Sequence, residues 1–248
     1  MIADELDSLP RSPHHAGTLS TDTIRRLEEL LPAHMAHTAE TGCGKSTILF
    51  SNLSDDHTAF CLDDREYGPD SSVVFFEESS LSKVDRVKFV FGPTQKTLPV
   101  YDGFTSYDAV LIDGPHGFPF PELEYYFFYP HIREGGRLIL DDIHIPTIGR
   151  MADFLQEDDM FVLEEKIGTT AVFRRTSAAT FDPFGDGWWK QKYNQRRVPS
   201  DHAFYLNDGK KMASAYGPSP NGMAREQQSA ASSLGRLLGL DRMLGRPR

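Results

Sequence analysis

The stretch of sequence that decides the fold lies between residues 87 and 148. It contains VKFVF (87–91), DAVLIDG (108–114) and GRLILDD (136–142), three short apolar runs separated by segments long enough for helices. Strands that alternate with helical segments are typical of βαβ units and a parallel sheet. The segment PELEYYFFYPHI (121–132) supplies a helix between the last two runs. The sequence thus predicts an α/β fold with helices on both faces of the sheet.

The alternation continues on both sides of this stretch. Towards the N-terminus, residues 20–32 have apolar side chains at helical spacing, and HTAFCL (57–62) reads as a strand. Towards the C-terminus, residues 146–156 read as a helix. The runs MFVLEEKI and TAVFRRT, split at Gly168-Thr169, read as a hairpin. A parallel sheet closed by an antiparallel hairpin is uncommon among nucleotide-binding folds.

Length and composition set the domain organisation. We expect a flexible leader (1–19), a catalytic domain (20–176), a C-terminal extension (177–216) and a basic tail (217–248) that is flexible or weakly helical. No run approaches the roughly 20 apolar residues of a membrane helix, so no membrane association is expected. The two cysteines argue against a disulfide framework and for the cytoplasm.

Charge is divided unevenly along the chain. The net charge of −10 combines +7 in residues 187–248 with −17 in residues 1–186. An acidic body repels a phosphate backbone, so we expect no nucleic-acid partner and a small-molecule substrate instead. The oligomeric state stays open, a homo-oligomer included.

The segment AETGCGKST (39–47) is a glycine loop with two interpretations. It can be a Walker-type phosphate loop closed by Gly44-Lys45-Ser46, with Ala39 in place of the first glycine. It can also be the ExGxG loop of methyltransferases, with Glu40, Gly42 and Gly44 before a helix. Ala39 lacks the conformational freedom of glycine, and Glu40 would place an anion where a triphosphate binds. These two points favour the methyltransferase interpretation. The loop by itself does not exclude either interpretation.

A pair of acids follows the strand at 57–62. Asp63 and Asp64 come about 20 residues after Gly42, the spacing at which an acid accepts hydrogen bonds from ribose hydroxyls. A phosphate-loop enzyme has no need of this acid. Asp63 is the preferred ligand and Asp64 the second choice.

Taken with their spacing, VKFVFGPTQKTLP, YDAVLIDGPHG and YPHIREGGRLILDDIHIPTI resemble the third to fifth strands of class I S-adenosylmethionine (SAM)-dependent methyltransferases. The resemblance covers roughly residues 34–175. It implies a Rossmann-like, doubly wound sheet of seven strands with an antiparallel last strand, and SAM as cofactor. The turn at residues 92–95 is similar to the adenine-side turn of catechol O-methyltransferase-like enzymes. The cofactor-binding residues predicted in this way are Glu40, Gly42, Gly44, Ser46, Asp63, Asp64, Thr94, Gln95 and Asp113.

The same resemblance implies a metal site. Metal-dependent O-methyltransferases, and the cephalosporin hydroxylase-like proteins, carry acids after the fourth and fifth strands, where this chain has Asp113, Asp141 and Asp142. The chain departs from the catechol enzymes in having Asp142 where they carry Asn, and Gly114-Pro115-His116 where they place a lysine. The identities of base and substrate therefore do not carry over.

Electrostatics supports the metal prediction independently. Three carboxylates at adjacent strand ends repel one another unless a hard cation such as Mg²⁺ or another divalent ion neutralises them. Such a cation can lower the pKa of an acceptor hydroxyl. His116 is the predicted base beside Asp113, and His144 is the rival base or an additional ligand.

These observations lead to one expected function and two alternatives. We expect divalent-metal-assisted O-methylation of a small hydroxylated metabolite or sugar-like acceptor, with SAM as the methyl donor. The alternatives are a phosphate-loop NTPase or kinase that uses residues 42–46, and a SAM-binding protein without catalysis.

Overall fold

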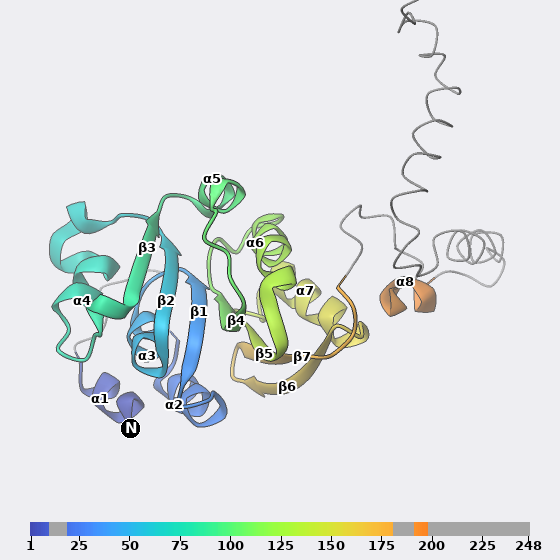
Figure 1. Cartoon of the computed structure of the whole chain (residues 1–248), viewed down its shortest axis with the longest axis horizontal. Coiled ribbons are helices and arrows are strands. Elements are labelled where there is room, and N and C mark those ends of the chain that lie inside the picture. Colours follow the sequence, from blue (N-terminus) through green and yellow to red (C-terminus); the bar gives the residue numbers. More distant parts are fainter. Residues whose placement is uncertain (10–18, 181–190, 198–248) are drawn as a thin grey trace, which may run out of the picture. The chain divides into compact units, whose positions relative to one another are not determined.

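The sheet has seven strands, as the sequence predicts. The computed structural model describes residues 1–9, 19–180 and 191–197. The strand order is β3-β2-β1-β4-β5-β7-β6, with β7 antiparallel to both neighbours and the other pairs parallel (Figure 1). The strands are β1 (Met35–Thr41), β2 (Ser54–Cys61), β3 (Val87–Phe91), β4 (Tyr107–Ile112), β5 (Ile132–Leu140), β6 (Phe161–Ile167) and β7 (Thr170–Arg175). The predicted doubly wound α/β fold with a reversed last strand is confirmed.

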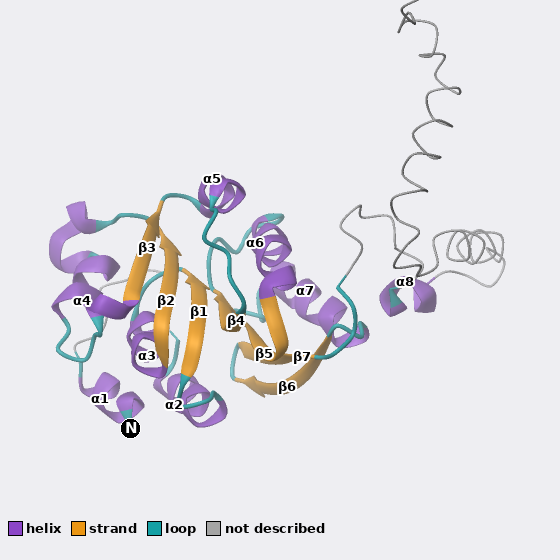
Figure 2. Cartoon of the chain, viewed as in Figure 1, coloured by secondary structure: helices purple, strands orange, loops and turns teal. Residues whose placement is uncertain are grey.

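Helices connect the parallel strands, as Figure 2 shows. The described α-helices are α1 (Ile2–Ser8), α2 (Thr21–Leu30), α3 (Lys45–Leu53), α4 (Ser72–Glu78), α5 (Thr94–Thr97), α6 (Phe120–Phe128), α7 (Pro146–Glu157) and α8 (Lys192–Arg197). The described 3₁₀ helices are η1 (Arg65–Asp70), η2 (Val84–Arg86), η3 (Leu98–Val100) and η4 (Tyr129–His131). The helix predicted at 20–32 is α2, and Ser20 caps it by accepting a hydrogen bond from the Thr23 amide.

Two hydrophobic cores cover the two faces of the sheet. In β4, Ala109 and Leu111 face the core that α1 to α4 complete, while Val110 and Ile112 face the core built with α6 and α7. Successive side chains of a strand point to opposite faces, so a strand buried on both sides must be apolar throughout. This is why residues 109–112, AVLI, are all apolar.

Residues 1–9, the first part of the predicted leader, include a helix. Residues 2–8 form α1, whose Ala3 and Leu6 are buried in the core that α2 and α3 share. The Glu28 carboxylate accepts hydrogen bonds from the amides of Ile2 and Ala3, which have no partner within their own helix. Only two apolar side chains are buried, which is too few for a periodic signal. Residues 10–18 lie outside the described part.

The predicted domain boundary at residue 176 stays a prediction. The compact unit that contains the sheet is Met1–Tyr193. The ring of Tyr193 contacts Phe154 on α7, and the Lys192 ammonium lies 2.5 Å from Asp159. The predicted tail (217–248) lies outside the described residues. Within the described ranges, every helix is too short or too polar to traverse a lipid bilayer.

Candidate functional site

The loop between β1 and α3 requires glycine at one position. Gly42 has φ +108°, and a Cβ atom there would lie 2.9 Å from the carbonyl oxygen of Asp113. Its amide donates to the carbonyl oxygen of Phe60. A side chain is therefore excluded by both backbone conformation and space. The close approach places the predicted cofactor loop directly against the end of β4, where the predicted metal ligands begin.

Glu40 lies at the end of β1 and is fully buried. Its Oε1 accepts a hydrogen bond from the Thr47 hydroxyl and lies 3.1 Å from Nε2 of His57. The Thr47 oxygen in turn accepts from the amide of Gly44, which closes the first turn of α3. These contacts connect Glu40 to the first turn of α3. Its Oε2 is buried without a hydrogen-bond partner among the described residues.

The two acids after β2 have different surroundings. The Asp64 carboxylate accepts hydrogen bonds from the Ser71 hydroxyl and from the amides of Ser72 and Val73, so it holds the start of α4. Asp63 is exposed and contacts Arg65 at 3.4 Å. The Asp64 carboxylate is thus already bound to the first turn of α4. Asp63 therefore stays the preferred ribose ligand.

The remaining predicted cofactor residues lie at the first turns of two helices. Ser46 is buried in the first turn of α3. Thr94 begins α5 and is buried, and its hydroxyl has no hydrogen-bond partner among the described residues. The adjacent Gln95 is exposed. Both helices follow the carboxyl ends of parallel strands, the edge at which ligands bind in this architecture.

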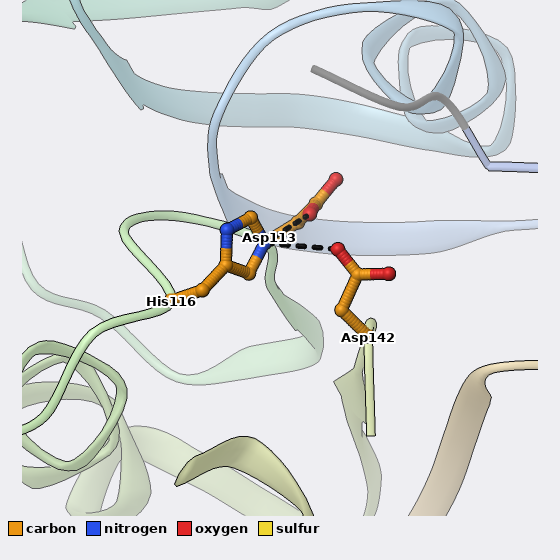
Figure 3. Close-up of side chains that lie close together, drawn as sticks. All are labelled: Asp113, His116 and Asp142. Carbon is orange, nitrogen blue, oxygen red and sulfur yellow. Dashed lines mark ion pairs between the residues drawn. The ribbon is translucent and has the colours of Figure 1, made fainter. Parts of the chain in front are cut away.

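Three titratable side chains meet after β4 and β5 (Figure 3). Nε2 of His116 lies 3.0 Å from Oδ2 of Asp142 and 3.8 Å from Oδ1 of Asp113. One ligand atom from each of the three residues lies within 4.8 Å of the others, so together they can hold a metal ion. His144 is further out, with Nδ1 3.5 Å from Asp142 and an exposed side chain.

Asp141, the third carboxylate of the predicted trio, stays a prediction as a metal ligand. Its Oδ1 accepts a hydrogen bond from the Thr170 hydroxyl on β7, 2.6 Å away, and the metal-competent cluster contains His116 in its place. The chain reverses direction at this point, because Asp142 has φ +56°, a left-handed conformation that only a few non-glycine residues adopt. Adjacent acids after a strand thus point to different neighbours.

The electrostatics of the cluster follows from crowding. Burial is the largest cause that raises the pKa of Asp113, to about 6, and the carboxylates of Asp141, Glu40 and Asp142 add to it while His116 opposes it. The pKa of His116 is raised, chiefly by Asp113. The site therefore carries more negative charge than the described side chains neutralise.

Glu124 is a residue that the sequence analysis missed. It lies on α6, is fully buried, and its Oε2 accepts a hydrogen bond from the Thr41 hydroxyl, which itself accepts from the Asp113 amide. A Cβ atom on Gly114 would lie 2.2 Å from Oε1 of Glu124. Burial raises the pKa of Glu124 to about 7. The sequence signal for Glu124 was an acidic residue within an aromatic-rich helical segment. A charged residue is seldom fully buried, so such a position points to a special role.

The geometry speaks against the phosphate-loop interpretation. A phosphate loop holds its ligand with free backbone amides. Here the amides of Gly42 and Gly44 donate to Phe60 and to Thr47. The buried Glu40 carboxylate lies beside them. Two of the loop amides are thus already used within the protein, and a buried carboxylate lies where the phosphates of a nucleotide would bind.

Comparisons with known proteins agree with this geometry. Residues 39–143 match the family model described as a methyltransferase domain. No curated protein matches the sequence. Among solved structures, the O-methyltransferase TomG from Streptomyces achromogenes, in complex with SAM, is 15% identical, with 71% of this chain and 86% of that chain covered and a TM-score of 0.53.

Two further structures have the same fold. The O-methyltransferase from Bacillus cereus in complex with SAH is 15% identical, with 71% and 90% of the two chains covered and a TM-score of 0.53. A methyltransferase from Geobacter sulfurreducens is 13% identical, with 71% and 89% covered and a TM-score of 0.52. The matched methyltransferase-domain model and the shared fold agree with the resemblance to class I SAM-dependent methyltransferases.

Proposed function

We propose that this protein transfers a methyl group from SAM to a hydroxyl oxygen of a small acceptor, with a divalent cation bound beside the acceptor. The observation that carries the proposal is the cluster of Asp113, His116 and Asp142 next to the glycine loop. Two solved relatives of the same fold, named as O-methyltransferases, hold SAM or SAH. The acidic body, net −17 over residues 1–186, favours a small hydroxylated or sugar-like acceptor over nucleic acid.

The proposed cofactor half lies on the β1 side of the site. Gly42 permits close approach of the backbone, and the buried Oε2 of Glu40 is an acceptor for a donor group of the cofactor. Asp63 is placed after β2 to accept hydrogen bonds from ribose hydroxyls. We propose that the cofactor is bound by Glu40, Gly42, Gly44, Ser46, Asp63, Thr94, Gln95 and Asp113.

The cluster fits a divalent cation. Two carboxylates face each other across His116, whose Nε2 is buried and forms no hydrogen bond of good geometry among the described residues. Mg²⁺ would take carboxylate oxygens and keep several waters, whereas a transition ion such as Mn²⁺ or Zn²⁺ also accepts imidazole nitrogen. When bound, the cation would neutralise the two carboxylates and lower the pKa of the acceptor hydroxyl.

His116 has two roles that exclude each other. Its Nε2 can accept the hydroxyl proton or can ligate the cation, because the atom has a single lone pair. We propose that Asp113 and Asp142 hold the cation and that His116, whose Nε2 lies 3.0 Å from Oδ2 of Asp142, accepts the proton.

Ligand protection tests the cofactor. We expect SAM and its demethylated product SAH to raise the melting temperature, and ATP with Mg²⁺ to leave it unchanged. Stabilisation by ATP alone would contradict the proposal.

Chelation and one variant test the metal and the base. We expect chelator to abolish methylation of an acceptor pool, and His116→Gln to lower turnover while the affinity for Mn²⁺ stays the same. If His116→Gln lowered the affinity for Mn²⁺ as much as it lowers turnover, His116 would be a metal ligand. Full turnover in chelator would remove the cation from the mechanism. SAM binding without any methylated product would favour a non-catalytic protein.

A further inference from the structure

A buried histidine in β2 lies directly behind Glu40. His57 is 1% exposed, and its ring stacks on Phe50 of α3 with the ring centroids 5.1 Å apart. Its Nδ1 lies 2.8 Å from the hydroxyl of Thr38, and its Nε2 lies 3.1 Å from Oε1 of Glu40. Both ring nitrogens are thus within hydrogen-bond distance of fixed oxygens. Nothing in the proposed chemistry uses this histidine.

The hydrogen bonds on the Nδ1 side have a single direction. The Ser54 hydroxyl donates its one proton to the carbonyl oxygen of Phe50, 2.7 Å away. In its contact with Thr38, 2.9 Å away, Ser54 must therefore accept, so the Thr38 proton is used there. The Thr38 oxygen must then accept from His57. Nδ1 consequently carries a proton.

The hydrogen bonds that lead through Thr47 to Glu40 also have a single direction. The Gly44 amide donates to the Thr47 oxygen, and the Thr47 hydroxyl donates to Oε1 of Glu40. Oε1 thus accepts from Thr47 and faces Nε2 of His57. A hydrogen bond between these two atoms requires one proton, on Nε2 or on Oε1. Placed on Nε2, the proton makes the ring an imidazolium and leaves Glu40 ionised.

We propose that His57 is a positioning residue: as an imidazolium, it holds Glu40 ionised and turned so that Oε2 faces the donor groups of the cofactor. This inference rests on the proposed SAM-binding function. Among the described residues, Oε2 of Glu40 has no hydrogen-bond partner, whereas Oε1 is shared by Thr47 and His57. Two contacts on one oxygen fix the rotation of the carboxylate and leave the other oxygen for a ligand.

Charge balance supports the same assignment. A fully buried carboxylate without a counter-charge would be costly, and Glu40 is also close enough to Asp113 to affect its pKa. The His57 imidazolium supplies the compensating charge beside Oε1. The pair of His57 and Glu40 is neutral as a whole, and Oε2 of Glu40 stays a charged acceptor for the ligand.

A double-mutant cycle tests the coupling, with SAH as the probe in calorimetric titrations. We expect His57→Gln, which keeps a neutral donor, to weaken SAH binding about tenfold, because a charge-assisted hydrogen bond becomes a neutral one. In the Glu40→Gln background the same substitution should change the affinity by less than about twofold. His131→Gln, a half-buried histidine stacked on Phe104, is the matched control and should bind SAH like the wild type.

A measurement on the unmodified chain avoids reliance on a variant that fails to fold. In protein labelled with ¹⁵N-histidine, His57 should carry protons on both ring nitrogens near neutral pH. A bare Nε2 would overturn the proposal, as would equal effects of His57→Gln in both backgrounds. If the wild type does not bind SAH at all, the proposed function falls as well. If the wild type binds SAH and His57→Gln binds it equally well, the role of His57 is contradicted and the proposed function is not.

Discussion

The two halves of the site are built in opposite ways. Around Glu40, buried side chains hydrogen-bond one another in a fixed sequence, and one carboxylate oxygen is left over. Around Asp113, half-exposed acids surround one imidazole and raise its pKa. The first half is organised before any ligand arrives. The second half stores unfavourable charge, which a bound cation and substrate would relieve. On the proposed function, the first half would determine the affinity for the cofactor and the second half would carry out catalysis.

The largest expected effect is on turnover, from a substitution in the half of the site around Asp113. Asp142→Asn should lower kcat for methyl transfer by about 10²–10³-fold, the usual cost of removing one preorganised electrostatic contact. Asparagine tolerates the left-handed backbone at this position, so the fold should persist. SAH affinity, measured by calorimetry, should stay the same because the cofactor half is intact. Asp153→Asn, on the exposed side of α7, is the control. A parallel loss of SAH binding would mean that the two halves are not separate.

The second prediction uses the titration of Glu124. Its folded-state pKa of about 7 lies above the ordinary value of 4.5, so the folded protein holds a proton that the unfolded chain releases. Stability should therefore fall as pH rises from about 4.5 through 7. Glu124→Gln should reduce the difference in unfolding free energy between pH 5 and pH 8 by roughly 2–3 kcal/mol. Denaturant titrations measure it.

A control variant separates this effect from general changes in charge. Glu78→Gln, on the exposed side of α4, should leave the pH dependence as it is in the wild type. An equal change in both variants would argue against a buried protonated Glu124.

The third prediction concerns the contact between the two halves. Gly42→Ala should cost roughly 1–3 kcal/mol of unfolding free energy, because it places a Cβ in a left-handed conformation against the Asp113 carbonyl. Gly117→Ala introduces the same methyl group into open space and should cost less than about 0.5 kcal/mol. Thermal unfolding distinguishes them. Equal costs would show that the loop can move away from β4.

The smallest effects should separate two adjacent acids. Asp63→Ala should weaken SAH binding about fivefold at unchanged stability, as expected for the loss of one ribose hydrogen bond. Asp64→Ala should lower stability by about 1 kcal/mol, because it removes the acceptor at the start of α4. Paired calorimetry and thermal melts measure both quantities. The reverse pattern would make Asp64 the cofactor ligand.

The fold and the edge of the sheet that carries the site could be predicted from local pattern. VKFVF, DAVLI and the run at 136–140 are strands where the sequence predicts them, and the hairpin turns at Gly168. Asp113 and Asp142 meet because the carboxyl ends of adjacent parallel strands converge. These conclusions need only periodicity and the order of elements.

Side-chain partners could not be predicted in the same way. Asp141 bonds Thr170, Asp64 holds α4, and Glu124 bonds Thr41 across 83 positions of sequence. Which neighbour an acid finds depends on backbone angles and packing that no local pattern records. Asp142 itself has a left-handed backbone, which the local sequence pattern does not reveal.

The sequence by itself thus determined the order of strands and helices, the glycine loop and the acidic edge of the sheet, since these depend on spacing along the chain. Only the tertiary structure decided that His116 joins the acids, that His57 lies behind Glu40, and that residues 2–8 pack on the core. The physical reason is that burial and hydrogen bonding are settled between residues distant in sequence, once the sheet has brought them together.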